Sequence, residues 1–139
     1  MAEKFRAREN YEFPLDAFSS FIYQLVLDGQ AAIDQTRFGK ELAVMDEERM
    51  VVNRGNSYTF RHDKIRDFFL AVAMKKADGV SKHYGDPRFL SAYLSLALQL
   101  PPDQARDLRE DVEDWALDYD DRSLADELGR ALRRKRGDA

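Results

Sequence analysis

The sequence predicts a mainly helical chain that contains one β-hairpin. Apolar residues recur at steps of three and four along most of the chain, which is the spacing of one face of an α-helix. Only one place combines two short β-prone runs with a polar, glycine-containing loop between them. Hydrophobic residues make up 44% and charged residues 35% of the 139 residues, a globular balance that suits one domain or two very small ones.

Two helices are expected before the hairpin. Pro14 suits the first turn of a helix over residues 14–27, and Asp28 with Gly29 ends it. The apolar face of this helix comprises Leu15, Phe18, Phe21, Ile22 and Leu25. A second helix is predicted over residues 34–47, and its inward stripe comprises Phe38, Leu42 and Met45. Gly39 lies inside the second segment and weakens it by about 1 kcal/mol.

The hairpin and a third helix follow. Residues 50–52 and 58–60 are the two β-prone runs, and the polar loop over residues 53–57 joins them. Two strands alone are marginal in water, so the hairpin is expected to pack against neighbouring helices. The third helix starts near His62, with Asp63 as a cap or first-turn carboxylate. Its inward stripe comprises Ile65, Phe68, Phe69, Val72 and Ala73.

The rest of the chain predicts three more helices. The first covers residues 87–99, and its inward residues are Leu90, Tyr93, Leu94 and Ala97. The second opens after the break at residues 101–102, and its inward residues are Ala105, Leu108, Val112, Trp115 and Tyr119. The third is capped by Asp120 and Asp121, and its stripe comprises Leu124, Leu128, Ala131 and Leu132. A basic, frayed tail is expected over residues 133–136.

These elements suggest two domains, over residues 1–78 and 79–139. The third helix pattern ends around residues 77–79, and a polar linker follows to about residue 86. His83 lies in this linker and is expected to be solvated. Short connections favour antiparallel helices, so the second domain is expected to be a small helical bundle or the start of an α-solenoid.

Composition excludes several classes of protein. The chain has no cysteine, so it can form neither a disulfide nor a thiolate metal site, and a cytoplasmic location is expected. Residues 1–10 are rich in charge and have no apolar stretch behind them, so no signal peptide is expected, and no apolar run reaches the ~20 residues of a membrane span. The net charge of -4 argues against a general affinity for nucleic acid.

One segment suggests a family. Residues 58–71 have the sequence Y-T-F-R-H-D-K-I-R-D-F-F-L-A, in which an aromatic, a spacer and His62 lead into an acidic-aromatic-aromatic helix. This segment resembles the motif that closes the winged-helix domain of NACHT and related STAND signalling ATPases. Helix, helix and hairpin is also the order of a winged helix, in which the hairpin is the wing. The resemblance covers roughly residues 13–76, and the helices after Pro87 are similar to the helical segment that often follows in that family.

The resemblance implies a role for His62. In that family the histidine of this motif reaches the phosphates of a nucleotide held by the ATPase domain, and so helps to keep the protein closed and ADP-bound. An imidazole can donate to a phosphate oxygen, and its charge is tunable near neutral pH. A structural hydrogen bond is the alternative role. Lys64, Arg66 and Asp67 are expected on the face opposite the apolar stripe, either as solvated surface or, for the cations together with Arg61, as a contact surface for another domain.

The sequence lacks the nucleotide-binding features of that family. No G-x-x-x-x-G-K-[ST] phosphate loop exists in the sequence, and no acidic strand end supplies a magnesium site. The chain would therefore meet ADP or ATP only through an ATPase domain, in cis or in trans, that this sequence lacks. We expect a non-catalytic regulatory module that also contacts other proteins through its C-terminal helices. It is either a piece of a larger ATPase or a stand-alone adaptor.

The sequence leaves two other classes of function open. A winged helix can bind DNA, with the helix before the wing in the major groove. That helix offers Arg37 and Lys40 against several carboxylates, and the hairpin adds Arg49, Arg54 and Arg61. Catalysis is the weaker alternative, because the many carboxylates are spaced as on an exposed helix face and no nucleophile–base arrangement or metal site stands out.

Overall fold

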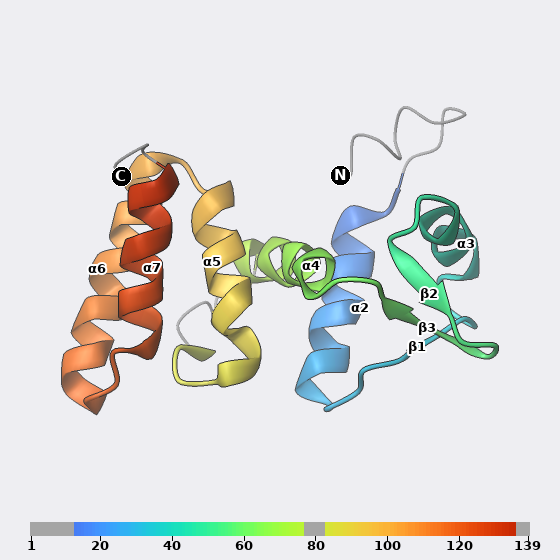
Figure 1. Ribbon diagram of the computed structural model, residues 1–139, viewed down its shortest axis with the longest axis horizontal. Helices are drawn as coiled ribbons and strands as arrows, with labels where there is room; N and C mark the ends of the chain where they lie inside the picture. Colours follow the sequence, from blue (N-terminus) through green and yellow to red (C-terminus); the bar gives the residue numbers. More distant parts are fainter. Residues whose placement is uncertain (1–12, 77–82, 136–139) are drawn as a thin grey trace. The chain divides into compact units, whose positions relative to one another are not determined.

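The computed structural model describes residues 13–76 and 83–135, which form helices and a small antiparallel sheet (Figure 1). The chain divides into two compact units, and the division falls between Ala73 and Met74. The predictions for residues 1–10, for the helix end at residues 77–79, for linker residues 80–82 and for Arg136 lie outside the described residues. Within residues 13–76 and 83–135, no helix combines the length and the apolar character needed to cross a bilayer.

The first unit contains the sheet. Its elements are α2 (Leu15–Leu27), β1 (Ile33–Asp34), α3 (Gly39–Glu47), β2 (Val51–Asn53), β3 (Ser57–Phe60) and most of α4 (Asp63–Lys76). The predicted hairpin is confirmed, since β2 pairs antiparallel with β3 and Val51 faces Phe60. Gly55 has a φ of 99° at the tip, where a residue with a side chain would be strained, and its N–H donates to Asn53 Oδ1 at 2.8 Å.

The second predicted helix begins later than expected. Residues 33–34 form β1, which pairs antiparallel with β3, so Ile33 lies opposite Tyr58 and is buried. The Asp34 carboxylate accepts a hydrogen bond from the Thr36 N–H at 2.9 Å, and such a local bond favours a turn over a helix. Helix α3 starts only at Gly39, so this glycine stands at a helix end rather than in its interior. Leu42 and Met45 are fully buried, as predicted.

Aromatic side chains form the centre of the first unit. The Phe18 ring lies edge-on to Phe69, with ring centroids 4.9 Å apart, and also contacts Phe38 at 5.2 Å. Phe13 packs against Phe18 at 5.4 Å and against Phe69 at 6.1 Å. Edge-to-face pairs of this kind are worth about 1 kcal/mol beyond their buried area. Helix α2 and the first half of α4 are therefore joined by one aromatic cluster.

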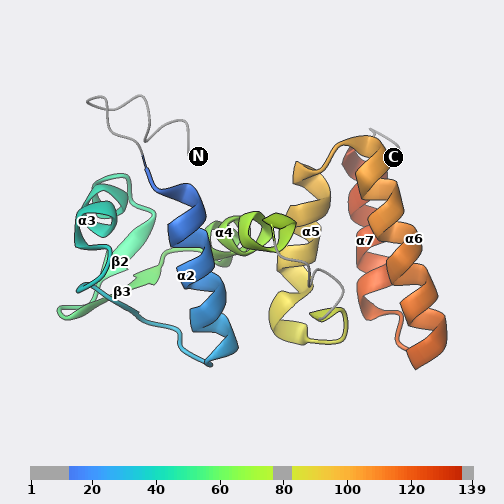
Figure 2. The same ribbon diagram turned by 180° about the vertical axis from the view of Figure 1, so that it is seen from behind.

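The second unit is helical. Its elements after α4 are η2 (Pro87–Phe89), α5 (Leu90–Gln99), α6 (Pro102–Tyr119) and α7 (Ser123–Lys135). Helices α5, α6 and α7 lie side by side, and consecutive helices run in opposite directions (Figures 1 and 2). The predicted stripe of α7 is confirmed, because Leu124, Leu128, Ala131 and Leu132 are buried. The antiparallel arrangement matches the short connections in the sequence.

Two expectations for α6 and α7 were wrong. Tyr119 was predicted to point inward but is 68% exposed, because α6 ends there and Asp120 takes the left-handed conformation with a φ of 52°. Its ring stacks on Trp115 at 5.0 Å instead of entering the core. The basic tail was predicted to be frayed, yet α7 continues through Lys135. The Lys135 Nζ donates to the carbonyl oxygens of Leu100 and Ala97, at 2.8 and 3.1 Å.

The linker histidine is also more ordered than predicted. The His83 ring stacks on Phe89 with ring centroids 4.2 Å apart, so it is not simply solvated. Its backbone N–H donates to the Tyr93 hydroxyl at 3.3 Å. The neighbouring Tyr84 is buried and donates to Asp111 at 2.6 Å, and burial together with this carboxylate raises the pKa of Tyr84. Residues 83–89 therefore pack onto the helices of the second unit.

Candidate functional site

The junction between β3 and α4 positions His62. Strand β3 ends at Phe60, and the Arg61 N–H continues the hairpin ladder by donating to the Met50 carbonyl at 2.9 Å. The His62 carbonyl then accepts from the Ile65 N–H at 3.1 Å, which makes it the first acceptor of the α4 turn. Backbone hydrogen bonds therefore fix the chain on both sides of His62, while the residue itself is exposed.

The predicted site residues share this junction but differ in exposure. Arg61, His62 and Lys64 are exposed. The Arg66 side chain is 35% exposed, and its guanidinium lies between two carboxylates, 4.0 Å from Asp63 and 3.6 Å from Asp67. Three side chains are thus available to a partner, whereas Arg66 is already engaged within the helix.

The burial of Asp67 shows that the predicted orientation of α4 was wrong at this position. It was expected on a solvated face with Lys64 and Arg66, but it is only 3% exposed. The cause is a second buried face, because Asp67 lies one turn before Leu70 and Ala71, which are fully buried. The prediction assumed one apolar stripe, whereas every residue of α4 from Phe69 to Met74 is buried. The sequence signal was present in the unbroken apolar run from Phe68 to Met74.

The buried carboxylate has an unusual environment. Asp67 Oδ1 has no hydrogen-bond partner, and its nearest cationic nitrogen, on Arg66, is 3.6 Å away. Burial raises the pKa of the Asp67 carboxyl above its ordinary value, and the Arg66 charge opposes that rise. The Arg66 Nε is also buried without a partner. The Arg66–Asp67 pair therefore has buried polar atoms without hydrogen bonds, and such atoms lower the stability of a folded protein.

The electrostatics of the junction favour an anion. The amino-terminal end of a helix carries a partial positive charge, and α4 begins directly after His62. Arg61 and Lys64 add two exposed positive charges, and Asp63 in the first turn offsets part of them. Phosphate oxygens are acceptors that such a group of donors can bind. No cluster of His, Cys, Asp or Glu in the described parts of the chain could hold a metal ion.

Two grooves lie away from the β3–α4 junction. One groove of about 480 Å³ lies along α2 and is lined by Ala17, Ser20, Phe21, Gln24, Leu25, Asp28 and Arg37. Another, of about 730 Å³, lies between α6 and α7. His62 lines neither of these two grooves.

Comparison with known proteins does not assign the chain. No family model, curated protein or solved structure matches it. The sequence placed His62, Arg61 and Lys64 at one junction, but it gave no sign that Arg66 is engaged with a buried carboxylate.

Proposed function

We propose that the chain is a non-catalytic regulatory module of the kind found in NACHT and STAND ATPases, and that its β3–α4 junction docks on a nucleotide-binding domain. In this proposal His62 faces the phosphates of the bound nucleotide. The observation that carries the proposal is the position of His62, which is exposed between a strand and a helix that hold its backbone. The resemblance of residues 58–71 to the motif of that family agrees with it.

The chemistry at the junction suits a sensor better than a catalyst. An imidazole can donate one hydrogen bond to a phosphate oxygen, and Arg61 and Lys64 would add attraction for the same charge. Loss of the terminal phosphate or a change of nucleotide would alter these contacts. A regulatory role then requires two states of the protein that differ in them. The helices α5, α6 and α7 would contact other proteins.

DNA binding, the alternative from a different class, has less support. The Arg37 guanidinium lies 4.9 Å from the Phe21 ring centroid and 5.7 Å from that of Phe38, so this cation is packed against α2. The exposed end of α3 carries Asp46 and Glu47, which would repel a phosphate backbone. The helix that precedes the hairpin is therefore a poor match for the major groove.

The test uses a protein in which this chain is joined to, or purified with, a phosphate-loop domain. Genomic sequence around the coding region establishes whether that domain is encoded in cis. We expect His62→Ala to accelerate the release of a fluorescent ADP analogue by about tenfold, the factor expected for one charge-assisted hydrogen bond. His83→Ala is the matched control, because it removes a histidine that stacks on Phe89 within the second unit. Release at the parental rate from the His62 variant would exclude the sensor role.

A further inference from the structure

The groove between α6 and α7 has a mixed lining. It has a volume of about 730 Å³ and is lined by Pro102, Asp103, Ala105, Arg106, Arg109, Leu132 and Lys135. Three cations therefore face one carboxylate, and apolar side chains from both helices complete the surface. The local excess of cations contrasts with the net charge of -4 of the whole chain.

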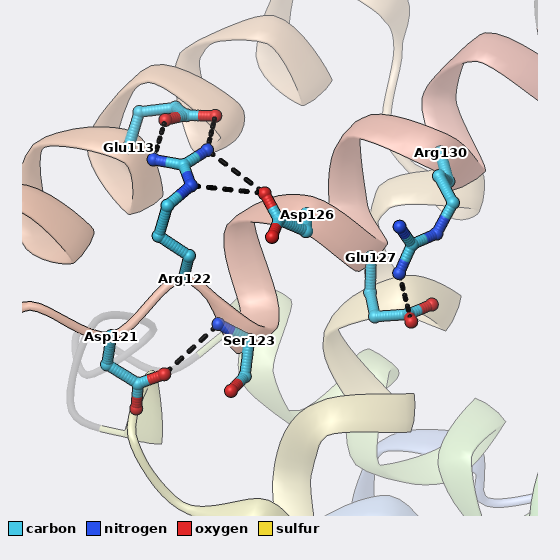
Figure 3. Close-up of polar contacts among 7 residues, drawn as sticks. All are labelled: Glu113, Asp121, Arg122, Ser123, Asp126, Glu127 and Arg130. Carbon is cyan, nitrogen blue, oxygen red and sulfur yellow. Dashed lines mark hydrogen bonds and ion pairs between the residues drawn. The ribbon is translucent and has the colours of Figure 1, made fainter.

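Within the described residues, the arginines on and beside α6 and α7 differ in their ion pairs: Arg122 and Arg130 have carboxylate partners, whereas Arg106, Arg109, Arg133 and Arg134 have none. Arg122 lies 3.1 Å from Glu113 and 3.1 Å from Asp126, and Arg130 pairs with Glu127; dashed lines mark these pairs in Figure 3. Arg106 and Arg109, by contrast, make no ion pair with any carboxylate in residues 13–76 and 83–135. Carboxylates are not scarce in the chain as a whole, which contains 26 Asp and Glu residues.

Positive groups also converge beside the groove. A Cβ atom added to Gly129 of α7 would meet the Arg109 guanidinium at 3.4 Å and the Arg133 guanidinium at 3.8 Å. Both groups therefore lie over the same point of α7, where the absence of a side chain leaves room for them. Like charges held close together repel each other, and an external anion between them would relieve that repulsion.

From these observations we infer that the α6–α7 groove binds an acidic segment of a partner protein. Carboxylates of the segment pair with Arg106 and Arg109, whose planar guanidiniums suit bidentate contacts with carboxylates. An apolar side chain of the segment lies against Ala105 and Leu132, both of which line the groove. The apolar lining favours a peptide over a nucleic acid, because a phosphate backbone offers nothing to cover it. The α6–α7 groove is a different surface from the one that carries His62, so this inference does not depend on the proposed function.

The test measures binding of a synthetic peptide by fluorescence anisotropy. The probe is a fluorescein-labelled peptide of repeated Glu-Glu-Leu, and the comparison peptide has Gln in place of each Glu. We expect the double variant R106A/R109A to bind the acidic probe at least about tenfold more weakly than the parent chain. The control R54A/R134A removes the same number of positive charges from exposed positions outside the groove and should bind like the parent. Far-UV circular dichroism checks that each variant is folded.

Amide chemical shifts locate the site. On addition of the acidic probe, shifts are expected in the first half of α6 and the second half of α7. The inference is overturned if both double variants bind equally well, if the Gln peptide binds as tightly as the Glu peptide, or if the probe does not bind even at low salt. It is also overturned if a single-stranded oligonucleotide displaces the probe from the groove, since the partner would then be a nucleic acid.

Discussion

Asp67 shows how one residue can make the stability of the first unit depend on pH. Its carboxyl is buried, has an Oδ1 atom without a hydrogen bond, and has a pKa raised by burial from the ordinary value of 3.8. Between 3.8 and the raised pKa, the folded chain binds more protons than the unfolded chain. The free energy of unfolding therefore falls as the pH rises through that interval, and the ionised Asp67 is a cost at neutral pH.

We expect Asp67→Asn to increase the free energy of unfolding by about 1 kcal/mol at neutral pH, because it removes a buried charge that Arg66 neutralises only in part. The variant should also lose the part of the pH dependence that lies just above 3.8. Urea unfolding at a series of pH values measures both effects. Asp63→Asn is the control, because the Asp63 side chain is 86% exposed and faces the same Arg66. A loss of ~2 kcal/mol or more in the Asp67 variant would instead mean that the ion pair stabilises the fold.

At the scale of the elements, the ends of two helices of the second unit, α5 and α7, are connected by hydrogen bonds. The last carbonyl groups of a helix lack partners within the helix, and a cation near them is favourable. Lys135 supplies that cation for α5, through hydrogen bonds to the carbonyl oxygens of Ala97 and Leu100. The end of α7 is thereby held to the end of α5, in addition to the packing between the two helices.

Lys135→Ala is expected to lower the free energy of unfolding by about 1 kcal/mol, since two backbone acceptors lose a charged donor. Chemical or thermal unfolding measures the change. Arg134→Ala serves as the comparison, because Arg134 is the exposed neighbour of Lys135 on the same helix. Equal stability of the two variants would show that the Lys135 hydrogen bonds contribute nothing beyond the loss of a surface charge.

At the scale of the whole molecule, the elements that could be predicted from the sequence are those with a regular local spacing of apolar residues. The hairpin and the helix after it were predicted because Gly55 marks the turn and because the apolar residues that follow recur at helical spacing. β1 was missed because two residues contain no period, and Ile33 becomes a strand residue only through pairing with Tyr58 of β3. Tyr119 was misplaced because periodicity does not show where a helix ends.

The candidate sites were predictable to different degrees. His62 was found because a motif surrounds it in the sequence. The arginines of the α6–α7 groove had no such signal, because each lies on an exposed or half-exposed helix position that looks like ordinary solvated surface. What distinguishes them is that they line one groove together with Lys135, and only the packing of α6 against α7 brings these cations together.

The central claim is that the β3–α4 junction faces the phosphates of a nucleotide held by a partner domain. The most direct measurement uses an ATP analogue that carries a photoreactive group on its terminal phosphate, bound to a complex that contains both the partner domain and this chain. After irradiation and proteolysis, mass spectrometry identifies the labelled peptides. The account predicts labelling within residues 60–66 of this chain, and labelling confined to the partner domain or to α5, α6 and α7 would contradict it.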